Sequence, residues 1–81
     1  MKILKFFSDS CGPCKVLEKN LQIANITYES HNVENSSIKL MEKYKIRAVP
    51  TLIKIDDEDN EIERFNGIMK PEELKKWCNE N

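Results

Sequence analysis

Two cysteines separated by Gly-Pro stand between an apolar run and a helical pattern, and this junction constrains the fold more than any other feature. The run Ile3-Leu4-Lys5-Phe6-Phe7 is apolar on both parities except at Lys5, which predicts a strand covered on both faces. From Cys14 onward, apolar residues recur at helical spacing between charged ones, which predicts an amphipathic helix. A strand that leads through Cys11 into a helix indicates an α/β fold with both thiols at the helix start.

The remaining patterns continue this alternation of strands and helices. They predict a strand over residues 26–33, a helix capped by Asn35-Ser36-Ser37 and carrying Met41 and Tyr44, strands over 51–55 and 61–65 joined by an acidic turn, and a helix from Pro71. The order is β-α-β-α-β-β-α, and its opening strand-helix-strand unit should be a right-handed parallel crossover. We therefore predict a single domain over residues 1–81, with a four-stranded mixed sheet flanked by three helices.

Composition and charge exclude several classes of function. The chain has 81 residues, of which 40% are hydrophobic and 33% charged, which is typical of one globular domain. Its 13 basic and 14 acidic residues include no basic block, so nucleic acid is not an expected partner. The apolar run near the N-terminus is too short for a signal-peptide core or a membrane span. We expect a cytoplasmic monomer without a membrane partner, in which a cysteine pair is catalytic or metal-binding.

The position of Cys11 favours its thiolate form. Unpaired amides and the positive end of the helix dipole point toward a sulfur at the helix start. Pro13 lies in the first turn, where its missing amide hydrogen costs little. Residues three apart on a helix have Cα atoms about 5 Å from each other, so Cys11 and Cys14 can form a disulfide. The pair suits thiol-disulfide exchange, in which Cys11 attacks a substrate disulfide and Cys14 displaces the reduced substrate.

A structural staple and a zinc site are other uses of a cysteine pair. A disulfide that encloses so few residues adds only about 2 kcal/mol through loop entropy. A zinc site would need His31 and Cys78, which are far apart along the chain, whereas structural sites usually draw on closely spaced ligands. The sequence therefore predicts no metal ligands and no cofactor besides the redox-active disulfide. Cys78 shares a helix face with Leu74 and Trp77 and is predicted to be a buried small hydrophobe.

Three stretches of the chain resemble the thioredoxin family: Cys11-Gly12-Pro13-Cys14-Lys15, Ile46-Arg47-Ala48-Val49-Pro50-Thr51-Leu52 and Glu63-Arg64-Phe65-Asn66-Gly67. The resemblance covers nearly the whole chain and implies a thioredoxin fold. It implies a thiol-disulfide oxidoreductase that reduces protein disulfides, with Cys11 and Cys14 as catalytic thiols and Gly12 and Pro13 in the active-site loop. It also implies a flavoprotein thioredoxin reductase as the electron donor.

The proline of the second stretch has an implied role of its own. The resemblance implies that Pro50 is cis and packs beside the cysteine pair. The backbone of Val49 is then free to pair with a substrate peptide. Cis peptide bonds occur chiefly before proline, and only in a small minority of those bonds, so the sequence pattern alone does not predict one here.

The chain departs from the family in length. A typical thioredoxin has an additional N-terminal strand and helix, so this chain is similar to glutaredoxins in size. The Gly-Pro between the cysteines, and the lack of a glycine pair followed by aspartate after the hairpin, favour a minimal thioredoxin. A glutathione-dependent, glutaredoxin-like oxidoreductase is one alternative, and a non-enzymatic metal-binding or interaction module is another.

Three residues also depart from the family pattern. Ser10 stands where a tryptophan usually precedes the first cysteine, and Lys45 stands where a glycine often ends the second helix. Lys5 stands where many thioredoxins bury an aspartate thought to handle the proton of the second cysteine. We expect the Lys5 stem to be buried and its amine to approach Cys14, where it would modulate the thiol pKa. In the alternative, Lys5 reaches solvent past the helix and touches neither thiol.

Overall fold

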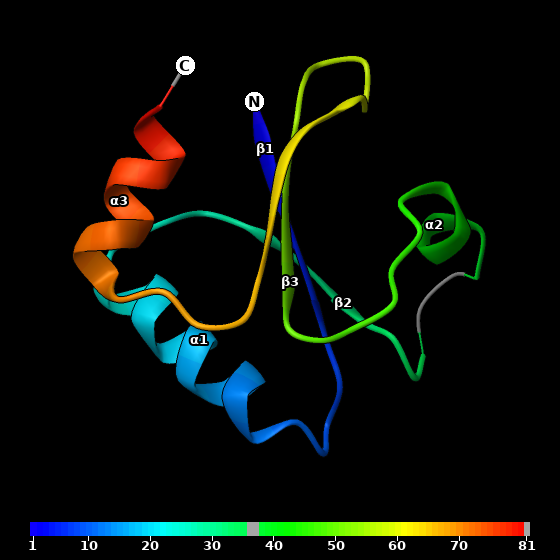
Figure 1. Ribbon diagram of the computed structural model, residues 1–81, viewed down its shortest axis with the longest axis horizontal. Helices are drawn as coiled ribbons and strands as arrows, with labels where there is room; N and C mark the ends of the chain where they lie inside the picture. Colours follow the sequence, from blue (N-terminus) through cyan, green and yellow to red (C-terminus); the bar gives the residue numbers. More distant parts are fainter. Residues whose placement is uncertain (36–37, 81) are drawn as a thin grey trace.

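The computed structural model describes residues 1–35 and 38–80 and contains the predicted order of elements (Figure 1). The strands are β1 (Lys2–Phe7), β2 (Glu29–Asn32), β3 (Thr51–Ile55) and β4 (Glu61–Asn66), and the helices are α1 (Gly12–Ile23), α2 (Ile38–Lys43) and α3 (Pro71–Asn79). The strands form one mixed sheet in the order β2-β1-β3-β4, in which β1 and β2 are parallel and the other pairs antiparallel. The predicted α/β fold is therefore confirmed, whereas the predicted caps Ser36 and Ser37 lie outside the described residues.

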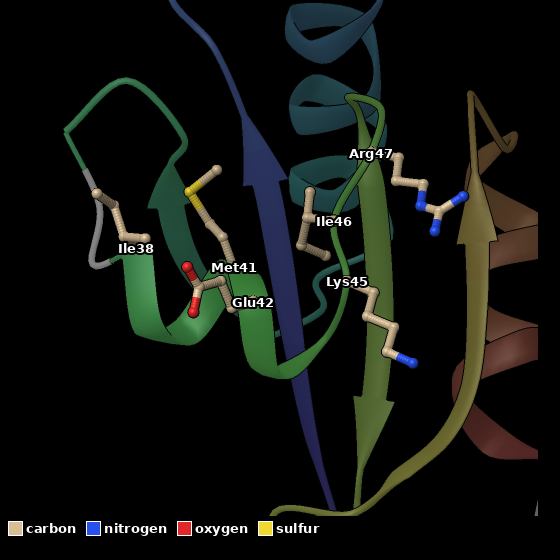
Figure 2. Close-up of a pocket in the computed structure, with 6 residues that line it drawn as sticks. All are labelled: Ile38, Met41, Glu42, Lys45, Ile46 and Arg47. Atoms are coloured by element: carbon tan, nitrogen blue, oxygen red, sulfur yellow. The ribbon is translucent and has the colours of Figure 1, made fainter.

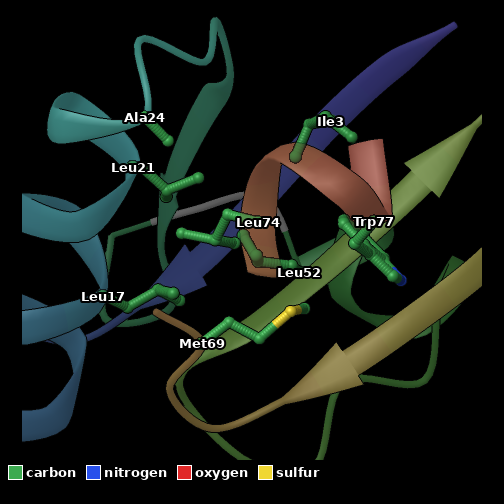
Figure 3. Packing of buried hydrophobic residues seen from close by; sticks show 8 residues of the cluster. All are labelled: Ile3, Leu17, Leu21, Ala24, Leu52, Met69, Leu74 and Trp77. Atoms are coloured by element: carbon green, nitrogen blue, oxygen red, sulfur yellow. The ribbon is translucent and has the colours of Figure 1, made fainter. Parts of the chain in front are cut away.

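The two faces of the sheet carry different helices because successive side chains of a strand point to opposite faces. In β1, Ile3 belongs to the cluster packed against α1 and α3, whereas Leu4 and Phe6 pack around Tyr44 on the side of α2. The first cluster is drawn in Figure 3 and consists of Ile3, Leu17, Leu21, Ala24, Leu52, Met69, Leu74 and Trp77. The apolar faces predicted for the first and last helices are thus the faces buried against the sheet.

The second strand, β2, is shorter than predicted, because the residues just before it form the C-terminal cap of α1. Asn25 follows the helix in a left-handed conformation with a φ of 58°. The amide of Ile26 then donates to the carbonyl of Leu21 at 3.1 Å, which satisfies an acceptor at the helix end. Ile26 and Tyr28 pack against the cluster of Figure 3, and pairing with β1 begins only at Glu29.

Besides Asn25 and Asp59, which has a φ of 65° in the turn between β3 and β4, two residues have a left-handed backbone. Lys45 follows α2 with a φ of 51°, and its amide donates to the carbonyl of Glu42 at 3.2 Å. A side chain in this conformation costs about 1 kcal/mol relative to glycine. Gly67 has a φ of 109°, which side chains rarely adopt, and it joins β4 to the segment that leads to α3. Glycine is therefore required at the second turn and absent from the first.

A buried lysine joins β3 to the end of α3. Lys54 is fully buried, and its Nζ donates to the backbone carbonyls of Trp77 and, at 3.3 Å, of Glu80. The Nζ also lies 3.5 Å from a carboxylate oxygen of Glu63 and 4.5 Å from the centroid of the Trp77 ring. The amine caps the last turn of α3, where carbonyl groups lack partners within the helix and the helix dipole favours a positive charge.

Candidate active site

Cys11 is the N-cap residue of α1, at the helix start where the sequence places it. Its backbone is extended, with φ −91° and ψ 105°, and its Sγ accepts a hydrogen bond from the amide of Cys14 at 3.0 Å. Its own amide donates to the carbonyl of Ser8 at 3.3 Å, which closes the turn between β1 and α1. A sulfur that receives a helix amide at this end of the dipole is stabilised as a thiolate once the pair is reduced.

Cys11 and Cys14 form a disulfide, with their Cα atoms 5.2 Å apart. Cys11 is partly exposed, whereas Cys14 is only 2% exposed. Gly12 and Pro13 between them are exposed, and a Cβ at Gly12 would meet no atom within 4 Å. The first turn of α1 therefore leaves one sulfur accessible to an incoming molecule and shields the other.

The segment before β3 lies at the same end of the sheet as the disulfide. Thr51 pairs with Phe6 near the end of β1, from which the chain leads to Cys11. Directly before Thr51, the Val49–Pro50 peptide bond is cis. Pro50 is buried and Val49 is partly exposed. The fold thus brings Val49 and Pro50, distant from the cysteines in sequence, to the disulfide end of the sheet.

Three polar side chains outside the predicted site hold the turn before Cys11. The Asn32 side chain donates to the Asp9 carboxylate at 2.9 Å, and the Asp9 amide donates to the Glu34 carboxylate at 2.8 Å. The Glu34 amide in turn donates to the side-chain oxygen of Asn32 at 2.9 Å. Asp and Asn in turns after strands are a sequence signal for such bonds, because their side chains pair with nearby backbone. The network ties the turn before Cys11 to the end of β2.

Lys5 points from β1 toward α1, and only 2% of its side chain is exposed. Its Nζ lies 3.7 Å from a carboxylate oxygen of Glu18 and over the rings of Phe7 and Tyr28, at 4.7 and 4.8 Å from their centroids. The expected burial of the stem is confirmed, and the amine does not reach solvent as the alternative supposed. The approach of the amine to Cys14 stays a prediction. The ionic partner of the amine is Glu18, a residue of α1 outside the predicted site.

The surroundings of Lys5 disfavour an isolated charge. Burial lowers the pKa of the Lys5 amine, and the nearby Glu18 carboxylate partly opposes this effect. Burial and the charge of Glu18 also raise the pKa of the Tyr28 hydroxyl. The space beneath α1 therefore accommodates the Lys5–Glu18 pair better than either charge alone.

A hollow lined by apolar and charged side chains lies between α2 and the segment that leads to Pro50. One part has a volume of about 400 Å³ and is lined by the residues drawn in Figure 2, namely Ile38, Met41, Glu42, Lys45, Ile46 and Arg47. A second part of about 190 Å³ is lined by Val33, Met41, Ile46, Arg47, Ala48 and Val49. The two parts share Met41, Ile46 and Arg47, so the hollow extends from α2 to Val49 beside the disulfide end of the sheet.

The fold does not bring the four candidate zinc ligands together. Cys11 and Cys14 are bonded to each other, His31 stacks on Phe6 with ring centroids 5.3 Å apart, and Cys78 lies partly buried on α3. Within residues 1–35 and 38–80, no group of three His, Cys, Asp or Glu side chains is arranged to hold a metal ion. Over the same ranges, no helix has both the length and the apolar character needed to cross a membrane.

Comparison with known proteins assigns the chain to a family. The family model described as Thioredoxin matches residues 1–80. The chain belongs to the thioredoxin family. A thioredoxin of Chlamydia pneumoniae is 31% identical over 84 residues, which cover 98% of this chain and 80% of the relative. A prophage-derived thioredoxin-like protein of Bacillus subtilis is 29% identical over 80 residues, which cover 99% of this chain and 98% of the relative.

Solved thioredoxin structures share the fold. A mutant thioredoxin from Halobacterium salinarum aligns with a TM-score of 0.79 and 26% identity, over 93% of this chain and 68% of that one. Thioredoxin-2 of a malaria parasite aligns with a TM-score of 0.85 over 98% of this chain and 81% of that one, and at 15% identity this likeness shows the fold alone. As a thioredoxin-family member with a Cys11–Cys14 disulfide, the protein is a thiol-disulfide oxidoreductase.

Cys78 is expected to be alkylated slowly in this thioredoxin-family protein. Burial raises the pKa of its thiol, and the positive charge of Lys54 opposes this only in part. Because the thiolate is the reactive form, iodoacetamide at neutral pH should modify Cys78 of the oxidised, folded protein several-fold more slowly than in denaturant. Mass spectrometry over time measures both rates. Equal rates would contradict the predicted role of Cys78 as a packed, inert thiol.

Proposed function

We propose that the protein reduces disulfides of other proteins, with Cys11 as the attacking thiol and Cys14 as the resolving thiol. The hydrogen bond from the Cys14 amide to the Cys11 Sγ carries this proposal, because it favours negative charge on Cys11. Exposure supports the same assignment, since Cys11 is accessible and Cys14 is buried. A protein substrate can therefore meet Cys11 first.

The proposed cycle consists of two exchange steps. The Cys11 thiolate attacks one sulfur of the substrate disulfide, and the other substrate sulfur leaves as a thiolate that takes up a proton. Cys14 then loses its proton and attacks the Cys11 Sγ. The intramolecular disulfide forms and the second substrate sulfur leaves as a thiolate. Two electrons have passed from the cysteine pair to the substrate disulfide.

The substrate peptide is proposed to pair with the backbone of Val49. This residue is partly exposed, precedes the buried Pro50 and lies at the disulfide end of the sheet. The exposed Gly12 and Pro13 leave room on the other side of the disulfide, since a side chain at Gly12 would meet open space. A peptide bound along Val49 would therefore be held next to Cys11.

The oxidised protein needs a donor of two electrons. Membership of the thioredoxin family supports a flavoprotein thioredoxin reductase as this donor. A reducing compartment such as the cytoplasm would keep the cysteine pair available for substrate reduction. We propose that the protein works there as a monomer.

Reduction of insulin disulfides tests this function. The protein is assayed once with thioredoxin reductase and its nicotinamide donor, and once with glutathione and glutathione reductase. We expect rapid insulin reduction with thioredoxin reductase. Activity with glutathione alone would assign the protein to glutaredoxin-like chemistry, and inactivity with both donors, together with stoichiometric bound zinc, would assign a metal-binding module.

A further inference from the structure

The second exchange step requires a proton acceptor for a thiol with almost no contact with solvent. Cys14 is 2% exposed, so bulk water reaches its sulfur poorly. An acceptor must lie close to this thiol and also exchange protons with solvent. Glu18 meets the second requirement, because 47% of its side chain is exposed.

Glu18 also meets the first requirement through its place on α1. It follows Cys14 by four residues, and residues four apart on a helix are surface neighbours with Cβ atoms about 5–6 Å apart. Helical side chains lean toward the helix N-terminus, so we expect a residue at this position to reach over the turn that contains Cys14. This separation suits proton transfer through one water molecule.

Lys5 holds the Glu18 carboxylate against the buried side of α1. The Nζ of Lys5 lies 3.7 Å from the carboxylate and over the rings of Phe7 and Tyr28. Packing alone does not require an ammonium here, because an apolar side chain would fill the place without the cost of removing a charge from water. A buried cation explains why the carboxylate of a half-exposed glutamate turns toward β1.

We propose that Glu18 accepts the Cys14 proton through one water molecule as Cys14 attacks the mixed disulfide, and that Lys5 is the positioning residue for the Glu18 carboxylate. The inference rests on the proposed roles of Cys11 and Cys14. The S–H bond of Cys14 breaks, its sulfur bonds to the Cys11 Sγ, and the substrate sulfur leaves with the electron pair of the broken disulfide. The Glu18 carboxylic acid then returns its proton to solvent or to the leaving thiolate.

The other titratable groups around this pair come from each neighbouring element. Cys11 lies at the start of α1, and Tyr28 faces Lys5 from the segment before β2. Burial raises the pKa of the Tyr28 hydroxyl above its usual value, so this group does not compete for the proton of Cys14. Toward α3, Lys54 is bonded to helix carbonyls with Cys78 beside it. Glu18 is the carboxylate that pairs with Lys5.

A chromogenic disulfide, dithiobis-nitrobenzoate, separates the two exchange steps. In reduced protein carrying Cys78→Ala, the first thionitrobenzoate release reports attack by Cys11, and the second reports attack by Cys14. We expect Glu18→Gln to leave the first release unchanged and to slow the second about tenfold at neutral pH. At alkaline pH, where Cys14 ionises without a proton acceptor, the rate of the second release in Glu18→Gln should equal the rate in the parent protein.

Three further variants test whether the effect arises from the Lys5–Glu18 pair. Lys5→Met should slow the second release in the same way, and adding it to Glu18→Gln should cause little further loss, because both act through one carboxylate. Glu29→Gln is the matched control. Glu29 lies in β2, and its carboxylate is 3.6 Å from the Nζ of Lys2, so this variant should release thionitrobenzoate as wild type does. Glutamine keeps an acceptor for Lys5, so Glu18→Gln decides the test even where Lys5→Met fails to fold.

The outcomes distinguish this inference from the proposed function. A wild-type second release in Glu18→Gln at neutral pH overturns the inference. A deficit that persists undiminished at alkaline pH also overturns it, because it indicates altered packing. If the parent protein gives no first release, or if Cys14 makes the first attack on the chromogenic disulfide, the proposed roles of the two cysteines are contradicted instead.

Discussion

A Cys14→Ser variant is expected to stop after the first exchange step and to accumulate as a covalent complex with its substrate. Serine fits the buried place of Cys14, but its hydroxyl does not displace the substrate sulfur from Cys11. A thiol from solution then has to resolve the mixed disulfide in place of Cys14. Because well-oriented internal groups act at effective concentrations of about 10⁵ M or more, turnover should fall at least about a thousandfold.

Non-reducing electrophoresis and mass spectrometry of the variant incubated with insulin measure this result. The expected product is the protein joined through Cys11 to one insulin molecule, whose two chains stay linked by the interchain disulfide that was not attacked, and it should dissociate on addition of a small thiol. Cys11→Ser is the matched control and should neither turn over nor trap substrate. Trapping by Cys11→Ser in place of Cys14→Ser would reverse the proposed roles.

A Lys54→Ala variant is expected to lose about 3 kcal/mol of the free energy of unfolding. The substitution removes a fully buried stem and leaves the carbonyls of Trp77 and Glu80 without the amine that caps them. Glu63 loses its ionic partner as well, although its partial exposure makes that contribution small. For a domain whose total stability is about 5–15 kcal/mol, the melting temperature should fall by more than about 10 °C.

Thermal and urea denaturation of Lys54→Ala and Lys2→Ala provide the comparison. Lys2 also belongs to a strand and pairs with a glutamate, but 60% of its side chain is exposed. Its replacement should change the free energy of unfolding by less than about 0.5 kcal/mol. Equal effects of the two substitutions would show that the amine of Lys54 does not stabilise α3.

The parts of the fold that follow from local patterns were predictable from sequence. The apolar runs over residues 3–7 and 51–55 form β1 and β3, the central strands covered by helices on both faces. Cys11 occupies the helix start that the junction predicts, because a cap depends on only a few neighbouring residues. The disulfide geometry follows in the same way from helical spacing.

The partners of the buried charges could not be predicted, because they depend on how distant helices dock. Within its strand Lys54 has no local signal of burial, and its acceptors come from the end of α3. Glu18 reads as an ordinary exposed position of an amphipathic helix until α1 is placed over Lys5. The shortened β2 also depends on how the helices dock, since Ile26 and Tyr28 pack against the cluster that α1 and α3 form with the sheet.

Helix α2 buries little surface against the sheet, and this affects how the protein can bind partners of different shape. No residue within α2 is fully buried: Leu40 and Met41 are only partly buried against the cluster that contains Tyr44, which lies just beyond the end of the helix. Segments with so little buried surface open locally at low free energy, so the amides of α2 should exchange with deuterium well before those of β1 and β3. We therefore expect the wall of the hollow that α2 forms in Figure 2 to be pliable, while Cys11 is held at the start of α1. Because the hollow reaches Val49, we expect this wall to adjust to differently shaped surfaces near Val49 without a movement of the reacting sulfur.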